Sequence, residues 1–371
     1  MKTKLTLLTL AGLATAAHSQ TVIDITGSTA GRSAVHNQII TQLDAGFTYA
    51  YDGTGAASRA TRAIYQGTYN GNAYIIRTYW AGSVNGVRDV AQQIQQTEFF
   101  DKSVTGTAAG ENVNPATPKA PASAETAPEI GYSDVFQTST QFTSPPLTVE
   151  DEVGIIAFKW FANKGSSAGL TNMTPSLAQA LYGSLGELPL SLFTGDSADA
   201  DKIVFSGGRN ADSGTRITTF AESGYGVFNQ VNQSNATFDA PGGTISELTF
   251  VGDSGQSSGG TLADSLSCSF AGGDFVGYVG ASDWPRANDG ADRGARELTW
   301  NGVPFSVENI QEGKYSFWGY LHMNRMALSG PALSFYEGMR DGLKANPGTL
   351  IKDDENVKVA RDGDGAPIFP K

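Results

Sequence analysis

Residues 209–215 read Arg-Asn-Ala-Asp-Ser-Gly-Thr, which places an arginine four residues ahead of a hydroxyl and glycine pair. We expect a helix to start at Ser213, because serine is a favoured helix N-cap. The first N–H groups of a helix lack intrahelical acceptors and lie at the positive end of its dipole, so they can bind an anion. The guanidinium of Arg209 presents a planar fork that suits a tetrahedral oxyanion. The stretch therefore predicts part of an anion site.

Two other loops combine a small hydroxyl residue with the start of an expected helix. Ser28 and Thr29 follow a short strand pattern and precede apolar residues at helical spacing, and Ser83 stands in the same position after a second strand pattern. Taken singly, each hydroxyl is explained as an ordinary helix cap, and Arg209 as a surface ion pair with Asp212. Three converging helix starts with one guanidinium would instead form an anion site that needs little formal positive charge.

Strand and helix patterns alternate along the chain, which predicts an α/β fold. The clearest helix starts at Thr174-Pro175, because a hydroxyl N-cap is followed by proline in the first turn. Residues 105–129 are rich in Ala, Pro, Thr and Gly and contain no aromatic residue, so we expect an exposed low-complexity loop insertion there. The strand predictions cover residues 22–25, 73–79, 153–161, 202–205, 248–251 and 275–279, and a final amphipathic helix is expected over 328–343.

Composition excludes several classes of protein. The chain has 371 residues, of which 40% are hydrophobic, enough to form a substantial core. Its 25 Lys and Arg against 37 Asp and Glu give a formal charge of −12, which argues against binding nucleic acid through many phosphates. Cys268 is the single cysteine, so no internal disulfide can form. No His or Cys pair has metal-ligand spacing, and we expect neither a metal nor a cofactor.

Residues 1–19 are typical of a cleavable signal peptide. Lys2 and Lys4 precede an apolar segment, and small residues at positions 17 and 19 favour cleavage between Ser19 and Gln20. The apolar run is too short to span a membrane. Removing this segment takes the formal charge from −12 to −14. We therefore expect a soluble protein that is periplasmic or secreted.

Two short motifs resemble those of proteases. Residues 252–255 read Gly-Asp-Ser-Gly, like the nucleophile loop of trypsin-like serine proteases, but neither His36 nor His322 stands in a recognisable triad context. Residues 212–215 match the core motif of aspartic proteases, and a second copy around Asp253 lies too close in sequence for the two lobes of that fold. We expect no enzymatic activity.

The segment 209–215 resembles the Arg-x-x-x-Ser-Gly-Thr loop of the periplasmic phosphate-binding proteins of ABC transporters. Residues 27–29 resemble the first loop of that family, residues 82–83 its glycine-serine turn, and residues 131–134 its Gly-x-Ser-Asp segment. The resemblance implies the two-lobed type II periplasmic binding fold, in which each lobe is a mixed sheet flanked by helices and the ligand lies in the cleft. It places lobe I at 20–160 plus 313–371 and lobe II at 161–312.

By this resemblance the ligand-binding residues are carried over from the family. Asp134 would give selectivity, because an ionised carboxylate can accept a hydrogen bond from the proton that phosphate carries and sulfate lacks. A turn carboxylate that caps a nearby helix is the alternative for Asp134. The chain has Ala30 where the family often places a bulkier residue, which bears on the identity of the ligand. The implied phosphate-binding residues are Ser28, Thr29, Ser83, Asp134, Arg209, Ser213, Gly214 and Thr215.

The resemblance implies an exported, monomeric substrate-binding protein that captures inorganic phosphate for uptake by an ABC transporter, with a membrane permease as its partner and no nucleic acid. A second hypothesis keeps the fold but makes the protein a secreted anion-binding or surface module without a permease. A third is a secreted hydrolase that uses Asp212 or Ser254.

Overall fold

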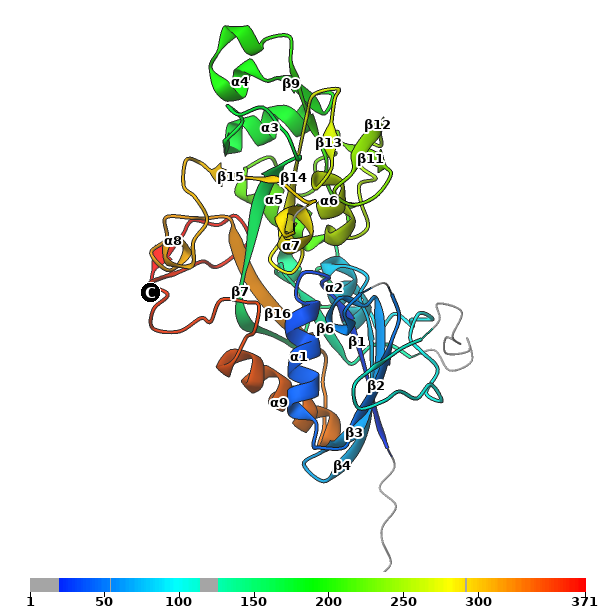
Figure 1. Ribbon diagram of the computed structural model, residues 1–371. Helices are drawn as coiled ribbons and strands as arrows, with labels where there is room; N and C mark the ends of the chain where they lie inside the picture. The colour runs from blue at the N-terminus through cyan, green and yellow to red at the C-terminus, as the bar shows by residue number, and fades with distance from the viewer. Residues whose placement is uncertain (1–19, 54, 114–125, 291) are drawn as a thin grey trace, which may run out of the picture.

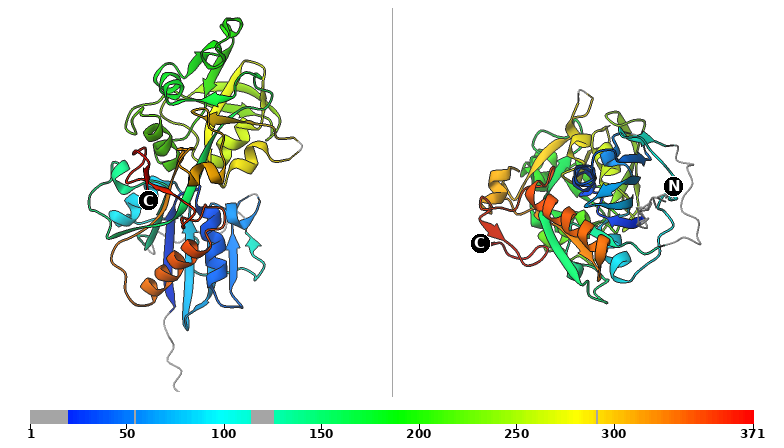
Figure 2. Two further views of the ribbon diagram at one scale, coloured as in Figure 1. Left: turned by 90° about the vertical axis from the view of Figure 1, so that its left-hand side faces the viewer. Right: turned by 90° about the horizontal axis from the view of Figure 1, so that it is seen from below.

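The computed structural model describes residues 20–371 except 54, 114–125 and 291, so the expected signal peptide lies outside the described residues. The chain forms two lobes, one above the other in Figure 1, and the left-hand view of Figure 2 shows the same division from the side. One large sheet runs through both lobes in the order β5-β2-β3-β4-β1-β6-β16-β7-β14-β10-β9, with β15 pairing to β7 and β8. The alternation of strands and helices confirms the predicted α/β class.

The lower lobe of Figure 1 contains the N-terminal part of the sheet. Its central strand β1 pairs in parallel with β4 and β6, and Ile23 and Ile25 of β1 are fully buried. Helices α1 and α9 pack against each other, and α2 packs on β1 and β6. These elements are β1 (Thr21–Gly27), α1 (Arg32–Gln42), β2 (Thr48–Tyr51), β3 (Arg62–Tyr69), β4 (Asn72–Tyr79), α2 (Ser83–Ala91), β5 (Glu111–Asn112), β6 (Ile130–Ser133) and α9 (Gly330–Ala345).

Two long strands, β7 (Val149–Ala162) and β16 (Trp318–Arg325), connect the lobes. Residues 149–157 of β7 pair with β16, which also pairs with β6 of the lower lobe. Residues 158–162 of β7 pair instead with β14 and β15 of the upper lobe. A single strand therefore passes from one lobe to the other, and the lobe boundaries given above stay a prediction.

The upper lobe carries the rest of the sheet and a separate three-stranded sheet. Helix α3 starts at Pro175, and the Thr174 hydroxyl accepts a hydrogen bond from the Leu177 amide at 3.2 Å, which confirms the predicted cap. The elements after β7, apart from β16 and α9, are β8 (Asn172–Met173), α3 (Pro175–Gly183), β9 (Glu187–Pro189), α4 (Ser191–Thr194), β10 (Ile203–Ser206), α5 (Gly214–Glu222), β11 (Ser234–Phe238), β12 (Thr244–Phe250), α6 (Gly259–Leu266), β13 (Ser269–Phe270), β14 (Asp274–Gly280), α7 (Trp284–Asn288), β15 (Arg296–Trp300), α8 (Val307–Gln311), β17 (Val359–Ala360) and β18 (Phe369–Pro370). No helix among the described residues is long and apolar enough to cross a membrane.

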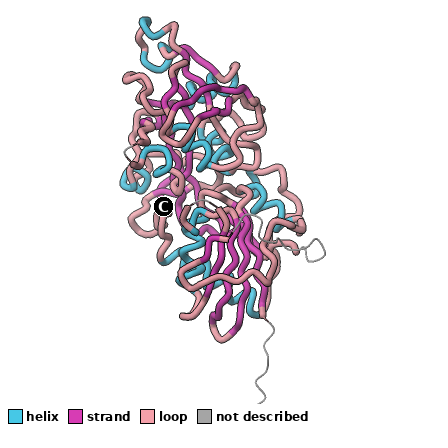
Figure 3. The backbone as a smooth tube through the Cα atoms, turned by 45° about the vertical axis from the view of Figure 1, so that its right-hand side comes forward, coloured by secondary structure: helices cyan, strands magenta, loops and turns pink. Residues whose placement is uncertain are grey.

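One hydrophobic core is continuous between the lobes. It includes Ile25 on β1 of the lower lobe and Tyr278 on β14 of the upper lobe. The buried ring of Trp160, on β7, lies 5.3 Å from that of Tyr278 and 6.1 Å from that of Phe317. Figure 3 shows that both lobes contain strands. The two lobes therefore share a packed centre as well as a sheet.

The predicted exposed loop at 105–129 is partly packed. Its residues 111–112 form β5, which pairs in parallel with β2, and Gly110 lies directly against the ring of Tyr49. At the far end, the Thr126 hydroxyl donates to Asp24, which forms a buried ion pair with Arg77. The absence of a side chain at Gly110 permits this close approach. Residues 114–125 of the predicted loop lie outside the described residues.

Candidate anion site between the lobes

Three loops that precede helices meet where the lobes face each other. The Gly82 amide donates to the Gly27 carbonyl at 2.9 Å, which joins the starts of α1 and α2. The Val84 amide of the lower lobe donates to the Asp212 carbonyl of the upper lobe at 3.2 Å, which brings the start of α5 to the same place. Gly27 has φ of +128°, and a Cβ there would overlap the Tyr132 carbonyl, so only glycine fits this crossing of the chain.

All eight predicted ligand-binding residues are buried, and the two lobes meet at Ser83, Asp134, Gly214 and Thr215. Four come from the lower lobe and four from the upper lobe. The Thr215 hydroxyl donates to Asp134 Oδ2 across the interface at 3.3 Å, and the Asp134 amide donates to Ser83 Oγ at 3.4 Å. Asp134 Oδ1 and Ser83 Oγ press against Gly214, where a Cβ would overlap both atoms. The two lobes are therefore in contact through the predicted site itself.

Two of the predicted serines accept hydrogen bonds from backbone amides just before or within the first turn of a helix. Ser28 Oγ accepts from the amides of Ala30 and Gly31 at 3.1 and 3.2 Å, and Ser213 Oγ accepts from the Arg216 amide at 3.2 Å. The capping alternative therefore holds for Ser213, which is the N-cap of α5, whereas Ser28 precedes α1, whose N-cap is Gly31. Because a hydroxyl can donate and accept at the same time, capping leaves each proton available for an anion.

Arg209 is buried, with 2% of its surface exposed, and is held from two sides. Its Nε and Nη2 donate to the carbonyls of Gln256 and Ser257 at 3.0 and 3.1 Å. Nη1 has no hydrogen-bond acceptor among the described residues. The alternative of a surface ion pair with Asp212 is wrong, because backbone carbonyls orient this guanidinium inside the protein. Burial lowers the pKa of Arg209, and the guanidinium keeps its charge because arginine is not deprotonated in proteins.

Asp134 is a fully buried carboxylate with one unsatisfied oxygen. Burial raises its pKa to about 6, and the nearby positive charge of Arg209 acts in the opposite direction. Oδ1 has no hydrogen-bond partner among the described residues. The carboxylate also lies at the N-terminus of α5, so the capping alternative describes its position too. Leaving a buried acceptor without a hydrogen bond costs free energy, so this position favours a ligand that donates a hydrogen bond to Oδ1.

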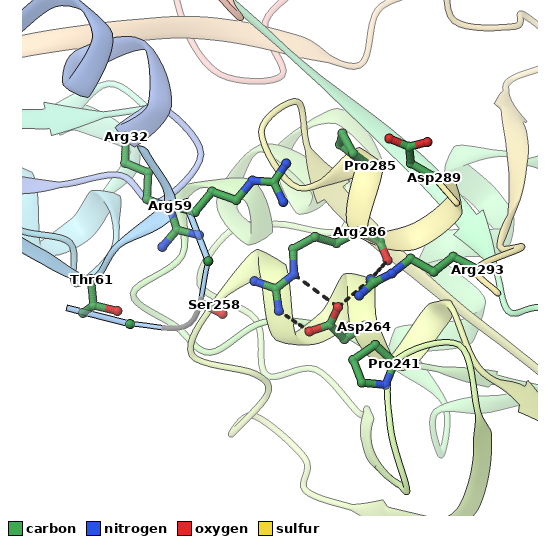
Figure 4. Close-up of a pocket in the computed structure, with 12 residues that line it drawn as sticks. Arg32, Arg59, Thr61, Pro241, Ser258, Asp264, Pro285, Arg286, Asp289 and Arg293 are labelled. Atoms are coloured by element: carbon green, nitrogen blue, oxygen red, sulfur yellow. Dashed lines mark hydrogen bonds and ion pairs between the residues drawn. The ribbon is translucent and has the colours of Figure 1, made fainter. Parts of the chain in front are cut away.

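A second group of charged residues, which the sequence did not predict, lies beside these eight. Arg32 Nη2 of the lower lobe lies 3.6 Å from Asp283 Oδ1 of the upper lobe, and both side chains are almost fully buried. A cavity of about 580 Å³ next to this pair contains Arg32, Arg59 and Arg286 among its lining residues (Figure 4). Residues 257–260 read Ser-Ser-Gly-Gly and start helix α6 at this cavity. That hydroxyl and glycine pattern is the same signal that marked the other three helix starts.

The residues of the two protease-like motifs have other contacts. Asp253 forms an ion pair with Arg216 and accepts from the Val231 amide at 3.0 Å, while Ser254 is exposed. His36 bonds to the Tyr65 hydroxyl at 2.8 Å, and burial lowers the pKa of His36 to about 4. The sequence Gly-Asp-Ser-Gly at 252–255 is therefore a turn anchored by its aspartate.

Replacing Gly214 by alanine would test whether the contact between lobes matters for ligand binding. We expect Gly214→Ala to weaken anion binding by about 1–3 kcal/mol, the usual cost of overpacking, because its Cβ would overlap Asp134 and Ser83 and hold the lobes apart. The affinity is measured by isothermal titration calorimetry. Gly294→Ala is the matched control, since its Cβ would meet only Lys164 at 3.5 Å. Equal affinities of the two variants would contradict the expectation.

Comparisons with known proteins identify the fold. No family model matches the chain, and no curated protein matches it. The structure is similar to an X-ray structure from Clostridium perfringens, described as that of a phosphate ABC transporter substrate-binding protein with bound phosphate. The identity is 15%, the match covers 90% of this chain and 100% of that one, and the TM-score is 0.52. An ABC-type phosphate transport receptor from Vibrio cholerae matches at 12% identity over 89% of this chain and 99% of that one, with a TM-score of 0.47. The chain has the two-lobed type II periplasmic binding fold.

Proposed function

We propose that the protein is an exported substrate-binding protein that captures phosphate between its lobes for uptake by an ABC transporter. The observation that carries this proposal is a buried carboxylate oxygen of the lower lobe and a guanidinium nitrogen of the upper lobe that both lack a hydrogen-bond partner. Asp134 Oδ1 lacks a donor, and Arg209 Nη1 lacks an acceptor, among the described residues. A ligand that accepts a hydrogen bond from the guanidinium and donates one to the carboxylate would satisfy both groups. Protonated phosphate does both.

The remaining residues of the site supply donors without adding formal charge. The starts of α1, α2 and α5 provide backbone N–H groups and hydroxyls from three directions. In a site that excludes water, such fixed dipoles interact strongly with an anion. The acidic surface of the protein is then no obstacle, because charges beyond about 10 Å are largely screened by salt.

Closure of the lobes completes this function. Ligand contacts come from both lobes, so binding stabilises the closed form over an open one. The closed form would present a surface that a membrane permease recognises. A secreted anion-binding module without a permease keeps the same site and differs only in its partner.

Thermal unfolding with phosphate and with sulfate tests the proposal. Binding stabilises a protein by about 2.7 kcal/mol when the ligand concentration is 100 times Kd. We therefore expect saturating phosphate to raise the melting temperature by several degrees and sulfate at the same ionic strength to raise it little, because sulfate has no proton for Asp134. If neither anion changes the melting temperature, the assigned site is wrong. Equal shifts with both anions would retain an anion site but reject selectivity for phosphate.

A further inference from the structure

We propose that the ligand is larger than inorganic phosphate: the cavity beside Arg209 binds a second anionic group, so that the substrate is a small phosphate ester that also carries a carboxylate or another anionic group. This inference rests on the proposed function, because it assumes that the phosphoryl group occupies the site between Asp134 and Arg209. It adds a subsite formed by the start of α6 and by arginines from both lobes.

The size of the cavity is the first argument. Its volume of about 580 Å³ lies within the range of roughly 300–1,000 Å³ that is usual for sites of small organic molecules. Arg32 and Arg59 line it from the lower lobe, while Ser258 and Arg286 line it from the upper lobe (Figure 4). The cavity therefore spans the same interface as the proposed phosphate site.

The start of α6 joins the cavity to the proposed phosphate site. Ser258 is the N-cap of this helix, and its hydroxyl accepts from the Thr261 amide at 3.1 Å. The next two residues are glycines. A Cβ at Gly259 would overlap Asp283 Oδ2 and lie 3.2 Å from Arg209 Nη1, and a Cβ at Gly260 would overlap Arg286 Nη1. One helix start therefore has the phosphate-site arginine on one side and a cavity arginine on the other, and side chains there would obstruct both.

Arg286 is oriented in the same way as Arg209. Its Nε and Nη2 donate to Asp264, and this leaves Nη1 without an acceptor among the described residues. Asp264 also accepts from Arg293 Nη1 at 2.7 Å, so one carboxylate fixes two guanidiniums. A fixed guanidinium with a free N–H beside a helix N-terminus is an arrangement that binds anions.

Arg32 supplies an unsatisfied group from the opposite lobe. Its side chain is 6% exposed, lines the cavity, and has a buried Nε with no hydrogen-bond partner among the described residues. Within the described part of the chain its one ion pair is the contact with Asp283 at 3.6 Å. Burial lowers the pKa of Arg32, and repulsion from the positive charges of Arg286 and Arg59 lowers it further. An anion between these guanidiniums would relieve their mutual repulsion.

The charge of the lining supports the same conclusion. Four arginines and two aspartates line the cavity, in a protein whose formal charge is −12. The two aspartates, Asp264 and Asp289, do not neutralise the group, and Asp283 next to it adds one more negative charge. Arg59 is exposed and has no ion-pair partner among the described residues. An anionic group on the ligand would balance the remaining positive charge.

Calorimetric titration of the full chain with a matched pair of ligands tests the inference. Glycerol 3-phosphate and 3-phosphoglycerate differ in that a hydroxymethyl group of the first is a carboxylate in the second. We expect 3-phosphoglycerate to bind about tenfold or more tightly, the effect of one charge-assisted hydrogen bond. Arg286→Met should remove this preference, so that the two esters bind with affinities within about twofold of each other. Lys202→Met, which removes an exposed charge elsewhere on the upper lobe, should leave the preference intact.

Two further measurements separate the possible failures. Arg59→Ala removes an exposed arginine without breaking an ion pair, so it tests the subsite if Arg286→Met does not fold, and we expect it to reduce the preference for 3-phosphoglycerate. Orthophosphate binding tests the proposed function alone. If orthophosphate binds while the two esters bind equally in the unaltered protein, the subsite is wrong and the proposed function stands. If none of the three ligands binds, both are wrong.

Discussion

Replacing Arg209 by methionine is expected to reduce phosphate affinity by about 100-fold to 1,000-fold, which corresponds to roughly 3–4 kcal/mol. The variant removes the buried guanidinium of the proposed site and leaves Asp134 without its compensating positive charge. Losing one partner of a buried charged interaction typically costs about 3–5 kcal/mol. Methionine has a similar length and fills most of the space, so the loss of affinity reflects charge and hydrogen bonding. Isothermal titration calorimetry with phosphate measures the effect.

Arg296→Met is the matched control for Arg209→Met. Arg296 lies in the same lobe and also donates to backbone carbonyls, those of residues 166–168, but it is not among the predicted site residues. We expect this variant to bind phosphate with unchanged affinity. Circular dichroism of both variants checks that they fold. A folded Arg209→Met protein that retains its phosphate affinity would remove Arg209 from the site.

Replacing Asp134 by asparagine is expected to change both the selectivity of the site and the stability of the ligand-free protein. It should raise the affinity for sulfate by about 100-fold or more, because a buried carboxylate no longer repels a fully ionised anion, a difference of roughly 3 kcal/mol. It should also stabilise the ligand-free protein at neutral pH, because it removes a buried charge with one unsatisfied oxygen. Competition titrations with sulfate and urea unfolding without ligand measure the two effects.

The pH dependence of the second effect follows from the raised pKa of Asp134. Burial moves this pKa from 3.8 to about 6 in the folded protein, so between these values the folded state binds more protons than the unfolded state. The contribution of Asp134 to stability therefore falls as pH rises through this window and is constant above it. The gain from Asp134→Asn should be absent near pH 4 and reach about 1–3 kcal/mol above pH 6.

Glu152→Gln provides the comparison for Asp134→Asn. Burial and the negative charge of Asp353 raise the pKa of Glu152 to about 7, but this residue lies on β7 outside the predicted site. Its replacement should also stabilise the protein at neutral pH, without changing the preference for phosphate over sulfate. If Asp134→Asn leaves sulfate affinity unchanged, Asp134 acts only as a helix cap.

The candidate site could be predicted in its parts because each part has a local signal. A hydroxyl and glycine pair before apolar residues at helical spacing marks a helix start wherever it occurs. Their convergence came from the family resemblance, since residue spacing does not say which loops meet. The start of α6 carries the same signal at residues 257–260, after the predicted strand at 248–251, but none of the segments that resemble the family includes these residues.

The pairing of β5 with β2 shows a different limit of sequence analysis. Residues 105–129 have the composition of a loop, and β5 is only two residues long. Its position depends on a contact with residues about 60 positions earlier, and on Gly106 and Gly110 lying against Tyr49. Parallel pairing between distant segments is determined by tertiary packing, which composition does not report.

The passage of β7 from one lobe to the other has a consequence for how the molecule denatures. Its first nine residues are hydrogen-bonded to β16 and its last five to β14 and β15, and the apolar cluster around Trp160 continues across the same point. Loss of either lobe would expose the apolar residues and the open strand edge of the other. The protein therefore constitutes a single cooperative unit: calorimetry would record one heat-absorption peak, and a fragment limited to one lobe would tend to aggregate through its uncovered edge.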